Sequence, residues 1–488
     1  MPPKKNTKPP SLKSASGAGF TFEDKAAAVL LCEMLTAVHS LGREFGIIQR
    51  LERQAGDWEP FGDLLLDVPN SDGKLIRCGG SVKSNRLVNA NGCDSELCVG
   101  MWATMAKAVF APESDFLLLI SAPLSAAASD HLSSLCQQAR SIDANRLDQK
   151  IVHTNVRKIY ESFRKVGDTT IEGLPGNVLA KLIHREFDFE ATVSRSETAA
   201  LKLCRDALRP VEQNEERAKD LWKRLCEIAQ ELRVSGGALT RAGISAKVRH
   251  KFGLRDDPCD TAGWMKLRTF SREGSEEIET SLPGDIKLPR KTEDAALRAA
   301  IIDSRACHVL GDSGSGKSAM IKGYATAIQA TGAEVIWIKA ERFSALASAL
   351  PDLLEVLLRC RQASALLVVD ALEGCTAPES FSALARLISS VAGMENSPWS
   401  VVLACQTPDW ARVCAALIKH LAGNAVLTKR VECGLLAKED FDLVCAASPT
   451  VAKLGQEPKL RRFLSTPKML DVLLSGQLAE NRVIAGGG

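Results

Sequence analysis

The eight residues GDSGSGKS, Gly311 to Ser318, decide the fold of the second half of this chain. They follow an apolar run, ACHVL, and precede a helical pattern, which is the strand–loop–helix context of a phosphate-binding loop. Glycines let the backbone wrap closely around phosphate groups, with its N–H groups pointing inward. We expect Lys317 to reach the β- and γ-phosphates of a nucleotide and Ser318 to hold Mg²⁺, at a helix N-terminus that favours anions. The predicted phosphate loop consists of Gly311, Asp312, Ser313, Gly314, Ser315, Gly316, Lys317 and Ser318.

Apolar runs alternate with helical patterns from about residue 305 onward. The runs are ACHVL, AEVIWIKA, ALLVVD, WSVVLAC and AVLTKRVEC. Five strands that alternate with helices favour a parallel, doubly wound α/β sheet. Residues 437–480 then return to a helical pattern, which predicts a helical extension after the sheet.

Polar residues end two of these predicted strands. The run ALLVVD ends in Asp370, where a carboxylate that holds Mg²⁺ is expected. Glu373 follows closely and could polarise an attacking water, although an acid at a helix start explains it equally well. Gln406 follows the run WSVVLAC, and it either senses a terminal phosphate or forms a Gln-Thr-Pro turn.

These features together resemble the STAND branch of AAA-related NTPases, which act as nucleotide-gated switches. The resemblance covers about residues 285–480, and it implies ATP and Mg²⁺ as cofactors and a homo-oligomer, with a tetramer favoured. The stretch FLSTPKMLDVLL is similar to the proline motif of that family, in which Pro467 would lie beside the adenine. Proline at a helix start is common, so this motif is less specific than the phosphate loop.

The N-terminal part of the chain reads as a second α/β unit, over residues 17–165. A helical pattern from about residue 20 carries Glu33 in the middle of its apolar face, which is costly unless something binds the carboxylate. The runs FGIIQRLER, GDLLLDV, KLIRCGGSVK and DFLLLISAPL read as strands. On the third of these, Ser81 and Lys83 point to one face and Val82 to the other.

Asp63 before one strand and Lys83 at the end of the next have the layout of metal-dependent nucleases of the PD-(D/E)xK type. Their chemistry needs carboxylates to hold Mg²⁺ and a lysine to stabilise developing charge. We therefore interpret Asp63 and Lys83 as catalytic, and Asp63 and Glu33 as metal ligands. Ser81 stands where that superfamily has Glu or Gln, and a hydroxyl is a poorer ligand. The second carboxylate must then be Glu33 or Glu52, or the site is inactive.

A wider resemblance links residues 17–255 to the double-stranded DNA nuclease modules of bacterial antiphage STAND proteins. It rests on GFTFEDKAAAVLL, GDLLLDV, SVKSNR and the helix that contains Trp102. The expected fold class is therefore an α/β multidomain protein with a restriction-endonuclease-like domain and a P-loop domain. The expected organisation is a disordered basic tail, a nuclease domain, a helical segment, a linker, a P-loop domain and a helical subdomain, either complete or truncated, at residues 1–16, 17–165, 166–258, 259–290, 291–434 and 435–488.

The bulk composition is that of an ordinary globular protein, with 45% hydrophobic and 25% charged residues. The net charge of +3 neither requires nor excludes nucleic acid, because a local basic groove can be hidden in a neutral total. The 15 cysteines include no CxxC pair, which favours reduced, mostly buried thiols over a zinc site. No apolar run approaches the ~18 residues of a membrane span, and the start of the chain lacks the apolar core of a secretion signal, so we expect a cytoplasmic protein.

Together these patterns lead to the hypothesis of an ATP-gated, Mg²⁺-dependent DNA endonuclease of antiviral defence, in which the NTPase oligomerises and activates the nuclease. Relatives carry a long C-terminal repeat array that senses a phage protein. This chain ends without one, so we expect a trigger sensed in trans or a truncated chain. Two alternatives stay open: a restriction-type NTPase–nuclease that translocates DNA, and a non-enzymatic ATP-binding scaffold with an inactive nuclease fold.

Overall fold

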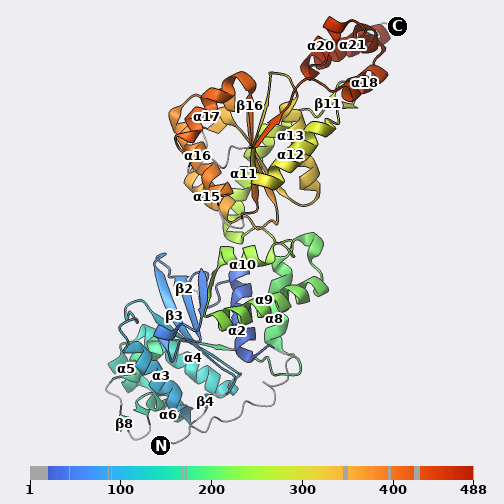
Figure 1. The fold of residues 1–488 in the computed structure, drawn as a ribbon. Helices are drawn as coiled ribbons and strands as arrows, with labels where there is room; N and C mark the ends of the chain where they lie inside the picture. The colour runs from blue at the N-terminus through green and yellow to red at the C-terminus, as the bar shows by residue number, and fades with distance from the viewer. Residues whose placement is uncertain are drawn as a thin grey trace, which may run out of the picture. The chain divides into compact units, whose positions relative to one another are not determined.

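The computed structural model describes residues 20–42, 44–85, 87–89, 91–166, 169–170, 173–343, 350–393, 397–421 and 429–486. The tail predicted at residues 1–16 lies outside them. The chain divides into two compact units, Met1–Pro258 and Cys259–Gly488 (Figure 1). Within the described residues, no helix is both long enough and apolar enough to cross a lipid bilayer.

The first unit is built on a six-stranded mixed sheet in the order β10-β1-β2-β3-β6-β9. β1, β2 and β3 are antiparallel neighbours, β6 and β9 run parallel to β3, and β10 pairs antiparallel with β1. The strands are β1 (Arg50–Arg53), β2 (Leu64–Pro69), β3 (Leu75–Lys83), β6 (Phe116–Ser121), β9 (Leu182–Glu186) and β10 (Ala238–Thr240).

Helices cover both faces of this sheet. α2 begins at a capping box between Thr21 and Asp24, and it packs with α8 and α9 on the face that carries Val82. α3, α4, α6 and α7 enclose the core on the opposite face. The helices of this unit are α2 (Phe22–Thr36), α3 (Ser95–Met105), α4 (Ala126–Ser141), α5 (Ala144–Lys150), α6 (Thr154–Ser162), α7 (Pro175–Lys181), α8 (Arg195–Ala207), α9 (Glu215–Ser235) and α10 (Arg241–Val248).

The first unit extends beyond the boundary predicted at residue 165. β9 and β10 lie in the segment expected to be mainly helical, yet both belong to the first sheet. α8 and α9 also share one hydrophobic core with α2. The segment 166–258 is therefore part of the first unit, because it supplies both edge strands and the helices that pack with α2 on one face.

The second unit contains the predicted parallel sheet, in the order β14-β15-β16-β13-β17. All its strand pairs are parallel, which confirms the α/β prediction. The strands are β13 (Ala306–Gly311), β14 (Glu334–Lys339), β15 (Ala365–Asp370), β16 (Trp399–Gln406) and β17 (Lys429–Glu432). A small hairpin joins β11 (Ser281–Leu282) and β12 (Ile286–Lys287). The helices are α11 (Thr261–Glu276), α12 (Lys291–Ser304), α13 (Lys317–Ala330), α15 (Leu350–Leu358), α16 (Pro378–Ala392), α17 (Trp410–Ile418), α18 (Lys438–Ala447), α19 (Pro449–Leu454), α20 (Pro458–Leu464) and α21 (Pro467–Gly486).

The segment predicted as a linker, residues 259–290, packs as part of the second unit. Trp264 and Leu267 of α11 are buried in the same core as the sheet strands. The Ser271 hydroxyl accepts a hydrogen bond of 2.7 Å from the backbone N–H of Trp337, on the edge strand β14. α11 thus covers that edge of the sheet, and the residues that follow it lie close to the phosphate loop.

Candidate functional site

The phosphate loop joins the end of β13 to the start of α13, as the sequence predicted. Gly314 and Gly316 have φ angles of 76° and 88°, a left-handed conformation that side chains other than glycine rarely adopt. A Cβ atom at Gly311 would lie 2.2 Å from the carbonyl oxygen of Cys433. The three glycines of this motif are therefore required by the backbone itself.

Lys317 and Ser318 lie where the loop meets the helix. The Lys317 ammonium donates to the carbonyl oxygens of Gly311 and Asp312, at 2.7 and 3.0 Å. The Ser318 hydroxyl donates to the carboxylate of Asp370 at 3.0 Å, so two predicted Mg²⁺ ligands meet at the carboxyl edge of the sheet. Burial raises the pKa of Asp370, and the hydrogen bond from Ser318 opposes that rise. A bound divalent cation would favour the ionised carboxylate, so this pair suits Mg²⁺.

The structure also brings Glu373 and Gln406 together. The Gln406 backbone N–H and side-chain amide donate to the Glu373 carboxylate, at 3.1 and 3.0 Å. Gln406 ends β16, which lies between the strands that carry the loop and Asp370. The pair therefore stands at the same sheet edge, with each side chain fixing the orientation of the other.

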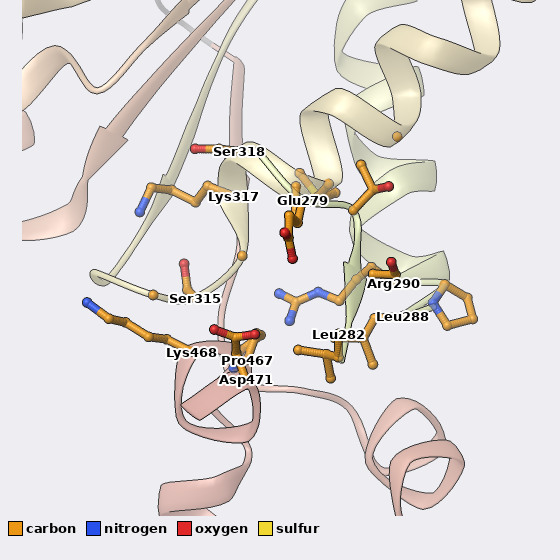
Figure 2. A pocket seen from close by; sticks show the side chains of 18 of the residues that line it. Glu279, Leu282, Leu288, Arg290, Ser315, Lys317, Ser318, Pro467, Lys468 and Asp471 are labelled. Carbon is orange, nitrogen blue, oxygen red and sulfur yellow. The ribbon is translucent and has the colours of Figure 1, made fainter. Parts of the chain in front are cut away.

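A cavity of about 890 Å³ opens beside the loop (Figure 2). Leu282, Leu288 and Pro289 give it an apolar wall, and the start of α21 closes another side. Pro467 lies next to Gly316, since a Cβ there would be 3.4 Å from the proline ring. The size and mixed lining suit an organic ligand held through its phosphates.

Arg290 is a residue of this cavity that the sequence did not single out. Its side chain is 5% exposed, and its Nη2 donates to the Gly434 carbonyl at 3.0 Å and lies 3.1 Å from the Glu293 carboxylate. Its Nε and Nη1 have no hydrogen-bond partner among the described residues. The sequence predicted a linker at this position, and nothing in the neighbouring residues indicated that the arginine side chain would be buried.

In the first unit, the structure brings Asp63, Ser81 and Lys83 together. The Lys83 ammonium lies 3.3 Å from the Asp63 carboxylate. The same carboxylate oxygen accepts from the backbone N–H of Val82 at 2.8 Å and from the Ser81 hydroxyl at 3.4 Å. The Lys83 and Asp63 side chains are 41% and 21% exposed, so a substrate can reach both from solvent.

Glu33 and Glu52 lie in other environments than the predicted ones. Glu33 forms a two-point ion pair with Arg185 of β9, at 2.7 and 2.8 Å. This pair stabilises the carboxylate inside the apolar face of α2, on the opposite sheet face from Ser81 and Lys83. Glu52 pairs with Arg50 on its own strand. The burial of Glu33 is therefore explained by an arginine rather than by a metal.

A different acid of α2, Glu23, lies near Asp63 and Lys83. It lies in the first turn of α2, and its pKa is raised first by burial and then by the charge of Asp63, while Arg53 and Lys83 lower it. The buried Arg53 contacts both residues. Its Nη2 lies 3.6 Å from the Glu23 carboxylate, and its Nε donates to the backbone carbonyl of Asp63 at 3.3 Å. Sequence periodicity favoured Glu33, at the centre of the helix, whereas it is the start of α2 that lies near Asp63 and Lys83.

Glu23 and Asp63 together suit a divalent cation. A cation would favour the ionised form of Glu23, whose pKa is raised first by burial and then by the charge of Asp63, and carboxylate oxygens are the ligands that Mg²⁺ prefers. The part of the chain that the structure describes has no cluster of three or more His, Cys, Asp or Glu side chains placed to hold a metal. The remaining coordination positions would then fall to water and to substrate oxygens, which is usual for Mg²⁺.

Glu33→Ala is expected to destabilise the first unit by about 3–5 kcal/mol, because it leaves Arg185 poorly solvated and unpaired. The two side chains are only 7% and 17% exposed. Thermal unfolding followed by circular dichroism should show a fall of roughly 10 °C or more in the midpoint of this unit. The control is Glu44→Ala, which removes an exposed ion pair with Arg140 and should change stability by less than about 1 kcal/mol. Parental stability in Glu33→Ala would contradict the structural role.

The glycine loop, the parallel sheet and the contact between Ser318 and Asp370 define the second unit as a P-loop domain of the α/β class. No protein-family model and no curated protein matches the chain.

Solved structures give weak likenesses. The Orc1 protein of Aeropyrum pernix in complex with DNA has 15% identity and a TM-score of 0.30, over 42% of this chain and 62% of that one. Cdc6p of Pyrobaculum aerophilum has 17% identity and a TM-score of 0.31, over 40% and 63%. This chain thus spans less than two thirds of either neighbour. A Walker-type ATPase of Pyrococcus abyssi has 11% identity and a TM-score of 0.27, over 43% and 80%.

Proposed function

We propose that this protein is an ATP-gated, Mg²⁺-dependent DNA endonuclease, with the nuclease in the first unit and the nucleotide switch in the second. The observation that carries the nuclease assignment is the cluster of Lys83, Asp63 and Glu23, in which an exposed lysine stands 3.3 Å from a carboxylate beside a second acid. Burial first, and then the charge of Asp63, raise the pKa of Glu23, and a perturbed carboxyl group beside an exposed lysine is typical of functional sites.

In the second unit, each loop residue has a defined task toward the nucleotide. The backbone of the glycine loop cradles phosphates, Lys317 neutralises their charge, and Ser318 with Asp370 holds Mg²⁺. The Glu373–Gln406 pair stands at the same sheet edge and is suited to orient a water near the terminal phosphate. The apolar wall at Leu282 and Leu288 gives the nucleoside a place to bind.

Asp370→Ala should weaken ATP binding strongly in the presence of Mg²⁺ and only slightly in EDTA. The carboxylate is proposed to act through the metal, since it accepts a hydrogen bond from the hydroxyl of Ser318, the other proposed Mg²⁺ ligand. Fluorescence titrations of the variant and parent, each with Mg²⁺ and with EDTA, give the four affinities needed. An equal loss under both conditions would contradict a role through the metal.

In the first unit, Glu23 and Asp63 would hold Mg²⁺ beside the scissile phosphate. That metal would supply an activated water and would neutralise charge on the phosphate. Lys83 stabilises the charge that develops on the phosphate as the P–O bond breaks. The buried Arg53 pairs with the Glu23 carboxylate and donates to the backbone carbonyl of Asp63, and Ser81 supplies a hydroxyl in the same cluster.

The gating part of the proposal follows the resemblance to antiphage STAND proteins. A phage-derived protein, sensed in trans, would trigger assembly of ATP-bound copies, with a tetramer favoured. Assembly would pair nuclease sites so that both strands of double-stranded DNA are cut.

The direct test is incubation of the protein with supercoiled plasmid, ATP and Mg²⁺ or Mn²⁺, with omission of each component in turn. Linear or nicked DNA that appears only with the metal supports the nuclease, and dependence on ATP supports the gating. One observation favours an inactive scaffold instead: Ser81 stands where the nuclease superfamily has Glu or Gln, and the described residues place only two carboxylates, Glu23 and Asp63, near Lys83. Bound ATP without cleavage under any metal would establish that alternative, and steady DNA-stimulated ATP turnover would favour a translocating enzyme.

A further inference from the structure

The first turn of α2 carries two neighbouring acids that differ in their exposure to solvent. The Glu23 side chain is 41% exposed, whereas the Asp24 side chain is 1% exposed. Successive residues of an α-helix are turned by about 100°, so the direction of one side chain fixes that of the next. The contacts that hold Asp24 inside the protein therefore also decide where Glu23 stands relative to Asp63.

Asp24 is held by Arg233, from the last turn of α9. The Arg233 Nε donates to Oδ1 of the carboxylate at 2.9 Å, and its Nη2 donates to Oδ2 at 3.1 Å. Such a two-point contact between a planar guanidinium and a carboxylate fixes orientation as well as distance. The Thr21 hydroxyl donates to Oδ2 at 2.8 Å, so both oxygens of Asp24 are engaged within the protein. Glu23 is thus left as the acid of this turn that faces the candidate metal site.

Arg53, in β1, contributes less to the placement of this turn. Its Nη2 lies 3.6 Å from the Glu23 carboxylate, and its Nη1 lies 3.5 Å from the Glu23 carbonyl and 3.6 Å from the Asp24 carboxylate. These contacts are longer than an ordinary N–H···O hydrogen bond of about 2.9 Å. Apolar packing holds α2 and α9 together, but it is non-directional. The ion pair between Asp24 and Arg233 is therefore the contact that best fixes the rotation of the turn.

Arg233 forms no ion pair with any other residue in the part of the chain that the structure describes. Its side chain is 29% exposed, and its partner Asp24 is 209 residues away in the sequence. An arginine near a helix C-terminus can hydrogen-bond the last carbonyls of its own helix. At this helix end the backbone N–H of Gly236 serves the Leu232 carbonyl, and the Arg233 side chain reaches across to α2 instead.

We propose that Arg233 is a positioning residue of the nuclease site. By holding Asp24 it sets the first turn of α2 so that Glu23 stands beside Asp63, and metal binding thereby depends on the docking of α9. This inference rests on the proposed metal site of the first unit.

The test measures Mn²⁺ affinity by calorimetric titration of the whole chain with Asp370→Ala, which removes the proposed metal ligand of the second unit. In this reference protein, Arg233→Ala should weaken Mn²⁺ binding roughly 10- to 100-fold, the usual cost of losing a residue that orients a metal ligand. Arg233→Lys keeps the charge but not the two-point contact, and it should recover part of the affinity. Arg224→Ala removes ion pairs with Glu227 and Glu231 from the same helix and should bind Mn²⁺ like the reference protein.

The direction of the change separates position from charge and from stability. Removal of a positive charge near a cation site favours the cation, so a purely electrostatic role predicts tighter Mn²⁺ binding in Arg233→Ala. Ile228→Val removes one methyl group from the buried side of α9, and it loosens the packing without touching the ion pair. Its Mn²⁺ affinity should stay that of the reference protein.

A second measurement needs no change at residue 233. If docking of α9 favours metal binding, then bound metal favours docking to the same extent. Mn²⁺ should therefore slow amide hydrogen exchange of residues 228–235 in the reference protein, but not after Glu23→Gln is added. This measurement and Arg233→Lys keep the inference testable if Arg233→Ala does not fold.

The outcomes separate this inference from the proposed function. If Glu23→Gln abolishes Mn²⁺ binding while a folded Arg233→Ala protein keeps the reference affinity, the positioning role is wrong and the metal site stands. Tighter binding in Arg233→Ala, an equal loss in Ile228→Val, or unchanged exchange at residues 228–235 would overturn the inference as well. If Glu23→Gln does not change Mn²⁺ binding, the proposed metal site fails and this inference fails with it.

Discussion

Lys317→Ala is expected to abolish ATP binding while the fold is kept. The Lys317 ammonium stands at the centre of the loop and donates to its carbonyl oxygens, at the point where the phosphates would accept. Its removal takes away the main positive charge of a site for a polyanion, so we expect a loss of at least about 100-fold in affinity. Fluorescence titration measures the affinity, and circular dichroism checks the fold.

The matched control is Lys419→Ala, an exposed lysine just after α17 that does not line the cavity. It should bind ATP like the parent, which excludes a general effect of charge. A folded Lys317→Ala protein with parental affinity would mean that the loop does not bind phosphate. The assignment of the second unit as a nucleotide-gated switch would then be wrong, irrespective of any DNA cleavage by the first unit.

The second unit was predictable because its signals are local. The phosphate loop needs only the spacing of Gly311, Gly316, Lys317 and Ser318, and each parallel strand is a short apolar run between helices. The first sheet depends on pairings between distant parts of the chain. β9 and β10 have 5 and 3 residues, and they sit within a helical segment. Strands this short carry little periodicity of their own, so the boundary at residue 165 could not be corrected from the sequence.

The candidate metal site illustrates a second limit. An acid on the inner face of a helix has two explanations, a bound metal and a buried arginine, and periodicity does not separate them. The partner of Glu33, Arg185, is 152 residues away in the sequence. Glu23 gave no such signal, since an acid in the first turn of a helix is ordinary. Only the fold shows that the first turn of α2 stands beside Asp63 and Lys83.

Lys83→Ala should lower the rate of DNA cleavage by about 10²–10³ and leave ATP binding unchanged. The lysine is proposed to stabilise charge on the phosphate, and the loss of one such group typically costs this much in rate. Stability should hardly change, because the Lys83 side chain is 41% exposed and its ion pair with Asp63 is partly solvated. Cleavage of linear and supercoiled DNA is followed on gels, with ATP affinity measured on the same preparations.

Glu23→Gln and Glu52→Gln then decide which acid serves the metal. Glutamine keeps the size of the side chain but cannot hold Mg²⁺ as a carboxylate does, so Glu23→Gln should match the loss seen in Lys83→Ala. Glu52 pairs with Arg50, and its glutamine variant should cut DNA at close to the parental rate. The reverse result would move the metal site to β1. If Lys83→Ala also cuts at the parental rate, then the exposed lysine beside Asp63 is only a surface ion pair, and the first unit requires another function.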